Sequence, residues 1–234
     1  MGGPASPPLV WITRAEPGAS ATARRVSDLG YRAVLSPLLR LEPVAAKIDL
    51  AGVAALALSS ANGVRAFAAL TSERGLPVYA VGGTTAEAAR AAGFAAVESA
   101  DGDVEALAAL LIARRPNGVV LHPGAAEPAG DLPGALAKAG IEVRALPLYR
   151  AVDAEPLEAL NLWESLDVVL IHSPRAGAAL ERLMAARGAP GMRAVTISQA
   201  AAEPLKHLEL RSVTTAPLPN EAALLNLLVQ NTPL

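Results

Sequence analysis

The sequence predicts an α/β protein built from parallel sheets covered by helices, and three observations predict it. Short apolar runs alternate along the chain with Ala-rich segments of helical periodicity, which is typical of a parallel sheet with helices on both faces. Hydrophobic residues make up 52% of the 234 residues and charged residues only 18%, so the chain can bury a sizeable core. Aromatic residues account for only 3%, while Ala and Leu dominate, which favours closely packed helices.

The first half of the chain contains five apolar runs that we predict to be strands. They cover residues 9–13, 32–39, 54–58, 78–81 and 95–98. Segments of helical periodicity lie between them, at residues 19–29, 61–70, 85–92 and 104–114. Gly30 and Gly93 follow two of these segments, and a glycine at that place is typical of a helix end.

The second half of the chain follows the same pattern. Predicted strands cover residues 119–122, 143–148, 168–171, 194–197 and 213–215. Predicted helices cover residues 132–139, 176–186, 200–207 and 221–228. Gly140 ends the first of these helices, as Gly30 does in the first half.

Matching landmarks of the two halves keep a nearly constant separation. The pairs, with offsets of 110, 113, 116 and 116 residues, are Gly30 and Gly140, Ser60 and Ser173, Val81 and Ile197, and Glu105 and Glu221. Such a series predicts a duplicated α/β unit with small insertions. Taken alone, the repeat suggests a tandem break near residue 115. We expect two similar lobes with a cleft between them, where ligands commonly bind.

Composition excludes several classes of function. Twenty basic and 22 acidic residues give a net charge of −2, so the chain has no overall positive field to hold nucleic acid non-specifically. Cysteine is absent, which excludes disulfides, thiolate nucleophiles and iron–sulfur clusters and fits a reducing cytoplasm. Residues 1–6 do not resemble a signal peptide, and the longest uncharged apolar stretch, 50–64, is too short to cross a bilayer. We therefore expect a cytoplasmic protein with no nucleic-acid or membrane partner.

Familiar cofactor and catalytic motifs are missing from the sequence. It has no dinucleotide-binding G-x-G-x-x-G, no phosphate loop and no G-x-S-x-G nucleophile turn. The three histidines lie far apart, so we expect no metal site. We interpret His122 and His172 as the first residues of loops that follow strands, and His207 as lying at a solvated helix end.

Small polar residues gather where predicted strands give way to helices. They are Thr13, Arg14, Ser59, Ser60, Asn62, Thr84, Thr85, Ser173, Ser198 and Gln199. A hydroxyl there caps the following helix and leaves its free N–H groups open to an anion. Any one of these residues is more often a cap alone. Several opening onto one cleft would form an anion-binding surface without net positive charge.

Six segments, in order along nearly the whole chain, resemble the uroporphyrinogen-III synthase family. Ile-Thr-Arg-Ala-Glu at 12–16 is similar to the family's opening motif, and residues 36–43 to its second strand and crossing. The others are residues 58–65 (Leu-Ser-Ser-Ala-Asn-Gly-Val-Arg), 79–86, 148–150 and 171–175. The chain departs from the family at Ser198–Gln199 and at Ala151, where the family has threonines.

The resemblance implies a lobe made of residues 1–40 plus 151–234 and a second lobe of residues 43–148. Two strands near residues 40–43 and 148–151 would cross between them and act as a hinge. The implied activity is the cyclisation of hydroxymethylbilane to uroporphyrinogen III with inversion of ring D and loss of water. The resemblance also implies a cofactor-free monomer, with transient contact to the preceding pathway enzyme.

Tyr149 is the best candidate for a catalytic role, as a proton donor to the departing hydroxyl; a packing role is equally consistent with the sequence. The candidate substrate-binding residues are Arg14, Ser59, Ser60, Asn62, Thr84, Thr85, Arg150, Ser173, Ser198 and Gln199. An alternative is a non-catalytic two-lobed module that binds a tetrapyrrole or another anion, which the altered turn at 198–201 would favour. A nucleotide-binding protein would need a phosphate loop that the chain lacks.

Overall fold

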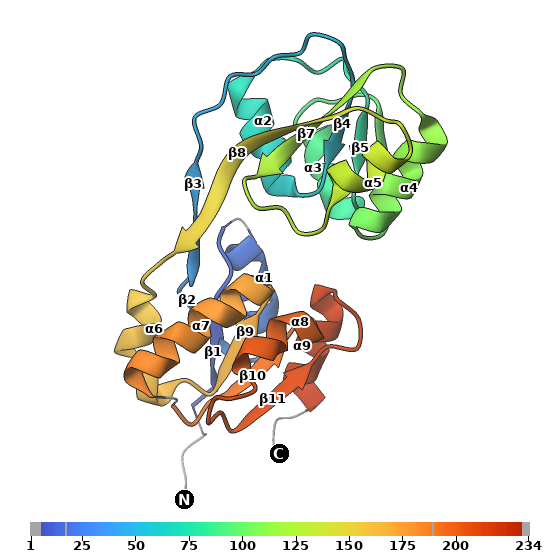
Figure 1. Cartoon of the computed structure of the whole chain (residues 1–234). Coiled ribbons are helices and arrows are strands. Elements are labelled where there is room, and N and C mark those ends of the chain that lie inside the picture. Colours follow the sequence, from blue (N-terminus) through green and yellow to red (C-terminus); the bar gives the residue numbers. More distant parts are fainter. Residues whose placement is uncertain (1–5, 17, 189, 231–234) are drawn as a thin grey trace, which may run out of the picture. The chain divides into compact units, whose positions relative to one another are not determined.

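The computed structural model describes residues 6–16, 18–188 and 190–230 (Figure 1). Residues 1–5, on which the signal-peptide argument depends, lie outside the described residues. The chain divides into two compact units. Unit 1 comprises Met1–Arg40 and Val152–Leu234, and unit 2 comprises Leu41–Ala151.

Unit 1 contains a five-stranded sheet in the order β11-β10-β9-β1-β2, with every neighbouring pair parallel. Its strands are β1 (Leu9–Ile12), β2 (Arg32–Leu35), β9 (Val168–Ile171), β10 (Arg193–Thr196) and β11 (Ser212–Thr215). Its helices are α1 (Gly18–Asp28), α6 (Leu157–Asn161), α7 (Pro174–Arg187), α8 (Gln199–Ala202) and α9 (Glu221–Gln230), with 3₁₀ turns η1 (Trp163–Ser165) and η2 (Glu203–Leu205).

Alternation along β1 shows how helices cover both faces of this sheet. Leu9 and Trp11 pack with α6, α7 and α8, whereas Val10 and Ile12 pack with α1 and α9 on the other face. All four side chains are buried, as expected for a central parallel strand. The α/β fold class predicted from the alternation of apolar runs and helical segments is confirmed.

Unit 2 contains a six-stranded sheet in the order β3-β8-β7-β4-β5-β6. Its strands are β3 (Leu39–Pro43), β4 (Val53–Leu58), β5 (Val78–Ala80), β6 (Val97–Ser99), β7 (Val119–Ala125) and β8 (Val143–Asp153). Its helices are α2 (Ala61–Leu70), α3 (Gly83–Ala91), α4 (Val104–Arg114) and α5 (Leu132–Lys138). Helices α2 and α3 pack on one face of the sheet, and α4 and α5 on the other.

The two connections between the units are the paired strands β3 and β8 (Figure 1). The N–H of Ala154 donates to the carbonyl of Leu38, and the N–H of Val44 donates to the carbonyl of Leu148. Residue numbers rise along β3 in the direction in which they fall along β8, so this pair is antiparallel. The other neighbouring pairs of the sheet, from β8 through β6, are parallel.

The expected single strand at residues 32–39 is wrong, because the strand is interrupted between β2 and β3. Pro37 has no N–H to donate, and Leu38 donates instead to the carbonyl of Thr13, beyond the end of β1. The expected helix at 200–207 is also shorter: α8 ends at Ala202, and a 3₁₀ turn containing Pro204 follows. Helix α6 and the turn after it were not predicted.

The two sheets repeat one strand order, which supports the predicted duplication. Strands β2-β1-β9-β10-β11 of unit 1 correspond to β8-β7-β4-β5-β6 of unit 2. The landmark pairs fall at equivalent places, since Ser60 and Ser173 cap α2 and α7, and Glu105 and Glu221 lie at the starts of α4 and α9. A tandem break near residue 115 is wrong, because that residue lies inside unit 2.

Candidate functional site

Each sheet has one place where successive connections run in opposite directions. In unit 2 it lies between β4 and β7, and in unit 1 between β1 and β9. In open α/β sheets, ligands bind at this switch point, beyond the carboxyl ends of the strands. Several of the predicted site residues follow one of these four strands.

In unit 2, two predicted residues form a direct hydrogen bond. The Tyr149 hydroxyl, on β8, lies 2.8 Å from Ser60 Oγ, at the end of β4. Ser60 Oγ also accepts the N–H of Gly63 at 3.0 Å and so caps α2. Gly63 is required by this packing, because an added Cβ would lie 2.9 Å from the carbonyl oxygen of Pro123. The capping role and the contact with Tyr149 therefore coexist on one hydroxyl.

His122 belongs to the same switch point, and the sequence interpretation of it is wrong. It lies inside β7 and not at the start of a loop, with 5% of its surface exposed. Its Nε2 lies 3.2 Å from Ser59 Oγ. Burial lowers the pKa of the imidazole, so the ring is neutral near pH 7. A histidine directly followed by Pro-Gly at a strand end was the available signal for a site residue.

The other predicted residues of unit 2 have varied surroundings. Asn62 Oδ1 accepts a hydrogen bond from Arg65 at 2.6 Å. Arg150 pairs with Glu42 through Nε at 3.0 Å and Nη2 at 2.9 Å. Thr84 is exposed, whereas Thr85 is buried within α3. Neither threonine caps that helix, because the capping position is occupied by a glycine without a side chain.

In unit 1, the end of β1 carries a cluster of charges around one carboxylate. Arg14 Nη1 lies 3.0 Å from Glu221 Oε2, and Arg25 Nη1 lies 3.2 Å from the same oxygen. The second oxygen, Oε1, accepts the hydroxyl of Thr22 at 2.5 Å. Sequence reasoning predicted Arg14 but missed its three neighbours. Together, Arg14, Thr22, Arg25 and Glu221 form the Glu221 cluster.

His172 lies next to this cluster at the end of β9. Ile12 on β1 pairs with Leu170 on β9, and continuing this register by two residues places Arg14 beside His172. Among the described residues, both ring nitrogens of His172 are buried without a hydrogen-bond partner. Burial, together with the positive charge of Arg14, lowers the pKa of His172 to about 4. The ring is therefore neutral near pH 7.

The remaining predicted residues of unit 1 lie at helix starts. Ser173 Oγ accepts the N–H of Ala176 at 3.2 Å and Ser198 Oγ accepts that of Ala201 at 3.3 Å, so both are helix caps. Gln199 is the exposed first residue of α8. The expected caps at Ser60, Ser173 and Ser198 are thus confirmed, while a substrate role for each stays a prediction.

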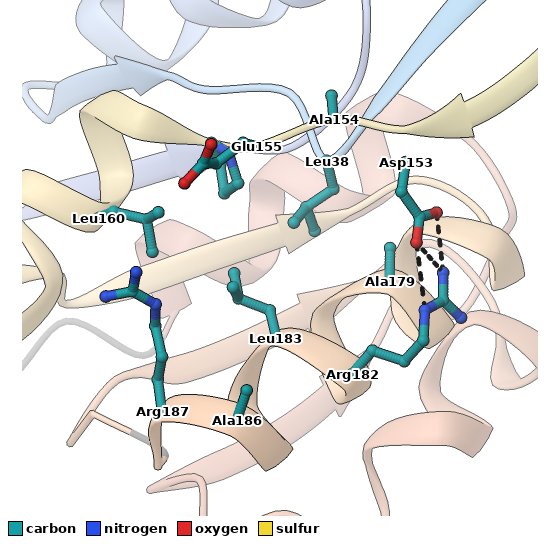
Figure 2. Close-up of a pocket in the computed structure, with 11 residues that line it drawn as sticks. Leu38, Asp153, Ala154, Glu155, Leu160, Ala179, Arg182, Leu183, Ala186 and Arg187 are labelled. Carbon is teal, nitrogen blue, oxygen red and sulfur yellow. Dashed lines mark hydrogen bonds and ion pairs between the residues drawn. The ribbon is translucent and has the colours of Figure 1, made fainter.

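A pocket of about 330 Å³ lies elsewhere in unit 1 (Figure 2). Leu38, Leu160 and Leu183 line it, and the ion pair between Asp153 and Arg182 lies at its edge. The α7 residues in its wall begin at Ala179, more than one helical turn beyond the end that follows β9. None of the predicted site residues lines it, so we do not assign the substrate to this pocket.

Within residues 6–16, 18–188 and 190–230, no three histidine or acidic side chains come close enough together to hold a metal ion. No helix in the described part of the chain has the length and apolar character needed to cross a membrane.

The chain belongs to the class of two-unit α/β proteins, in which each unit has a sheet of mainly parallel strands with polar side chains at its switch point. Two solved structures share this fold. Uroporphyrinogen-III synthetase from Helicobacter pylori 26695 matches with a TM-score of 0.71 and 17% identity, covering 97% of this chain and 100% of that one. A mutant uroporphyrinogen III synthase from the extremely thermophilic bacterium Thermus thermophilus matches with a TM-score of 0.55 and 20% identity, covering 95% and 98%.

A family model described as uroporphyrinogen-III synthase HemD matches residues 20–226. No curated protein sequence matches the chain significantly. The matched range spans most of the chain, and the chain belongs to the uroporphyrinogen-III synthase family. It is accordingly a cyclising lyase of haem biosynthesis, as the resemblance implied, and the non-catalytic alternative is not favoured.

Proposed function

We propose that the polar strand ends of the two units together hold hydroxymethylbilane while it closes to uroporphyrinogen III. The substrate carries eight carboxylates, and its hydroxymethyl group leaves readily to give a delocalised azafulvene cation. That cation closes by itself to the wrong isomer. The enzyme must therefore hold the chain so that the substituted carbon of the last ring attacks first.

The proposed reaction proceeds through a spiro intermediate that fragments and recloses. One proton is added to the departing hydroxyl, which leaves as water, and one proton is lost when the last pyrrole regains aromaticity. No net proton is consumed. Held geometry alone can contribute about 7–11 kcal/mol to such a step, so strong acid–base groups are not required.

The hydrogen bond between Tyr149 and Ser60 is the observation that supports Tyr149 as the proposed proton donor. Ser60 Oγ accepts the Gly63 N–H and lies 2.8 Å from the Tyr149 hydroxyl, and either hydroxyl can be the donor; the proposal uses the arrangement in which Ser60 donates. In that arrangement, the phenol keeps its proton for the substrate. His122 and Ser59 supply a neutral pair beside it. Arg14, Asn62, Thr84, Thr85, Arg150, Ser173, Ser198 and Gln199 complete the proposed substrate contacts.

A coupled assay tests the activity. Hydroxymethylbilane generated freshly by the preceding enzyme is given to the purified protein, and the oxidised products are separated by chromatography. We expect isomer III to dominate, to depend on the protein and to persist with a chelator. Isomer I alone, at the spontaneous rate, would reject the proposal and make tetrapyrrole binding the next measurement.

The proposal includes the arrangement that the resemblance implies: two lobes, a substrate cleft between them, and a monomer that meets the preceding enzyme only transiently. The antiparallel pair β3 and β8 supports a hinge, because only these two strands connect the units. Small-angle scattering should give a monomer whose radius of gyration falls when uroporphyrinogen III is added. An unchanged radius at saturating ligand would argue against closure.

A further inference from the structure

The Glu221 cluster has the composition of a carboxylate site. Two guanidinium groups and one hydroxyl converge on a single carboxylate, through one hydrogen bond at 2.5 Å and two ion pairs at 3.0 and 3.2 Å. Guanidinium groups are the preferred partners of carboxylates in proteins. Here the carboxylate comes from the chain itself.

The cluster lies where a ligand is expected. Arg14 follows β1 at the switch point of unit 1, and Thr22 and Arg25 lie on α1, which packs beside α9 on one face of the sheet. Glu221 is the first residue of α9. Gly18, at the start of α1, leaves room for the Arg14 guanidinium, which an added Cβ would overlap.

The charged groups of the cluster differ in exposure. Within the cluster, two arginines face one glutamate, and a second carboxylate, that of Glu16, also interacts electrostatically with Arg14. The arginine side chains are 34% and 58% exposed, whereas that of Glu221 is 18% exposed. The carboxylate of Glu221 is therefore less exposed than either guanidinium group of the cluster. His172 lies beside Arg14, and within the described part of the chain its buried ring nitrogens have no hydrogen-bond partner.

We propose that Arg14, Thr22 and Arg25 form a subsite for one carboxylate of hydroxymethylbilane, which Glu221 occupies in the free enzyme. This inference depends on the proposed function, since it assigns one substrate group to one place in unit 1. When the substrate arrives, its carboxylate takes over Arg14 and Arg25 from Glu221. Glu221 then acts as an internal competitor that keeps the arginines in place between turnovers.

Opposite effects of two substitutions distinguish a subsite from a structural ion pair. Arg14→Gln removes a charge-assisted contact with the substrate and should raise KM about 10- to 100-fold. Glu221→Gln keeps an oxygen for Thr22 but removes the competing charge, and should lower KM about 3- to 10-fold. The double variant should have a KM close to that of Arg14→Gln alone, and kcat should change less than KM in every case.

Two additional variants keep the test decisive. Arg25→Gln, at an exposed position, should raise KM about 3- to 10-fold even if Glu221→Gln folds poorly. Glu98→Gln is the matched control, because it breaks another arginine pair, with Arg114 in unit 2, and should leave KM unchanged.

The subsite proposal is wrong if the KM of Glu221→Gln rises or stays constant. In that case we expect all three single substitutions in the cluster to lower the unfolding temperature by similar amounts. That result would mean that the cluster only joins α1 to α9. It is distinct from failure of the proposed function, in which the wild-type protein itself forms no isomer III.

Discussion

Replacing Tyr149 by phenylalanine is expected to lower kcat for isomer III about 100-fold, at the lower end of the usual range for a lost general acid. The lower end is expected because the hydroxymethyl group leaves readily. KM should stay within about twofold, since the substitution removes one hydroxyl whose proton matters only as the leaving group departs. Single-turnover rates of isomer III formation, corrected for spontaneous isomer I, give the measurement.

Tyr79→Phe is the control for this substitution. Tyr79 lies on β5 of the same unit and loses the same hydroxyl, but it is outside the switch point between β4 and β7. We expect its rate to match that of the wild type. Full activity in Tyr149→Phe would remove the proton-donor role and reduce Tyr149 to a packing residue, while the family assignment would stand.

A second large effect is expected on stability, from the buried imidazole of His172. Its pKa is about 4 in the folded chain, against an ordinary value of 6.5, because burial and the neighbouring Arg14 disfavour the charged ring. Between pH 6.5 and 4 the unfolded chain therefore binds more protons than the folded one. The free energy of unfolding should be highest above pH 6.5 and fall by about 3 kcal/mol as the pH drops to 4.

Denaturant unfolding from pH 7.5 to 4 measures this loss. His172→Gln, which cannot titrate, should lose about 3 kcal/mol less than the wild type over that window. Other titrating groups are present in both proteins and cancel in the comparison. His207→Gln removes an exposed imidazole and serves as the control. Equal slopes for the wild type and His172→Gln would show that the ring is not held neutral.

Local pattern was sufficient to predict most of the strands and helices. Gly30 and Gly140 adopt φ angles of 85° and 73°, and so end α1 and α5 as glycine readily does. Strand ends were harder to predict. β7 continues through Pro123 because its register with β4 stops at Leu121, so beyond that point only β8 pairs with it. A proline is tolerated where no partner needs its N–H.

The residues that contact the predicted site residues could not be predicted from the sequence. Glu221 was recognised only as a landmark of the repeat, because it meets Arg14 across 207 residues of chain. Ser60 and Tyr149 are separated by 89 residues, and their contact depends on β4 and β8 both flanking β7. Residue type predicted which strand ends are polar, whereas the order of strands in the sheet decides which polar groups meet.

The shared strand order has a consequence for synthesis on the ribosome. Along the chain, β1 and β2 are the last two strands of one repeat, and β4 to β8 form a second, uninterrupted repeat. Strands β9 to β11 then supply the first three strands of the repeat to which β1 and β2 belong. Every partner that unit 2 needs has been made once residue 151 is translated, so it can fold while the rest is still emerging. The amino-terminal strands β1 and β2 cannot complete their sheet until β9, which begins at Val168, has left the exit tunnel. The first segment to be translated is therefore among the last to be folded.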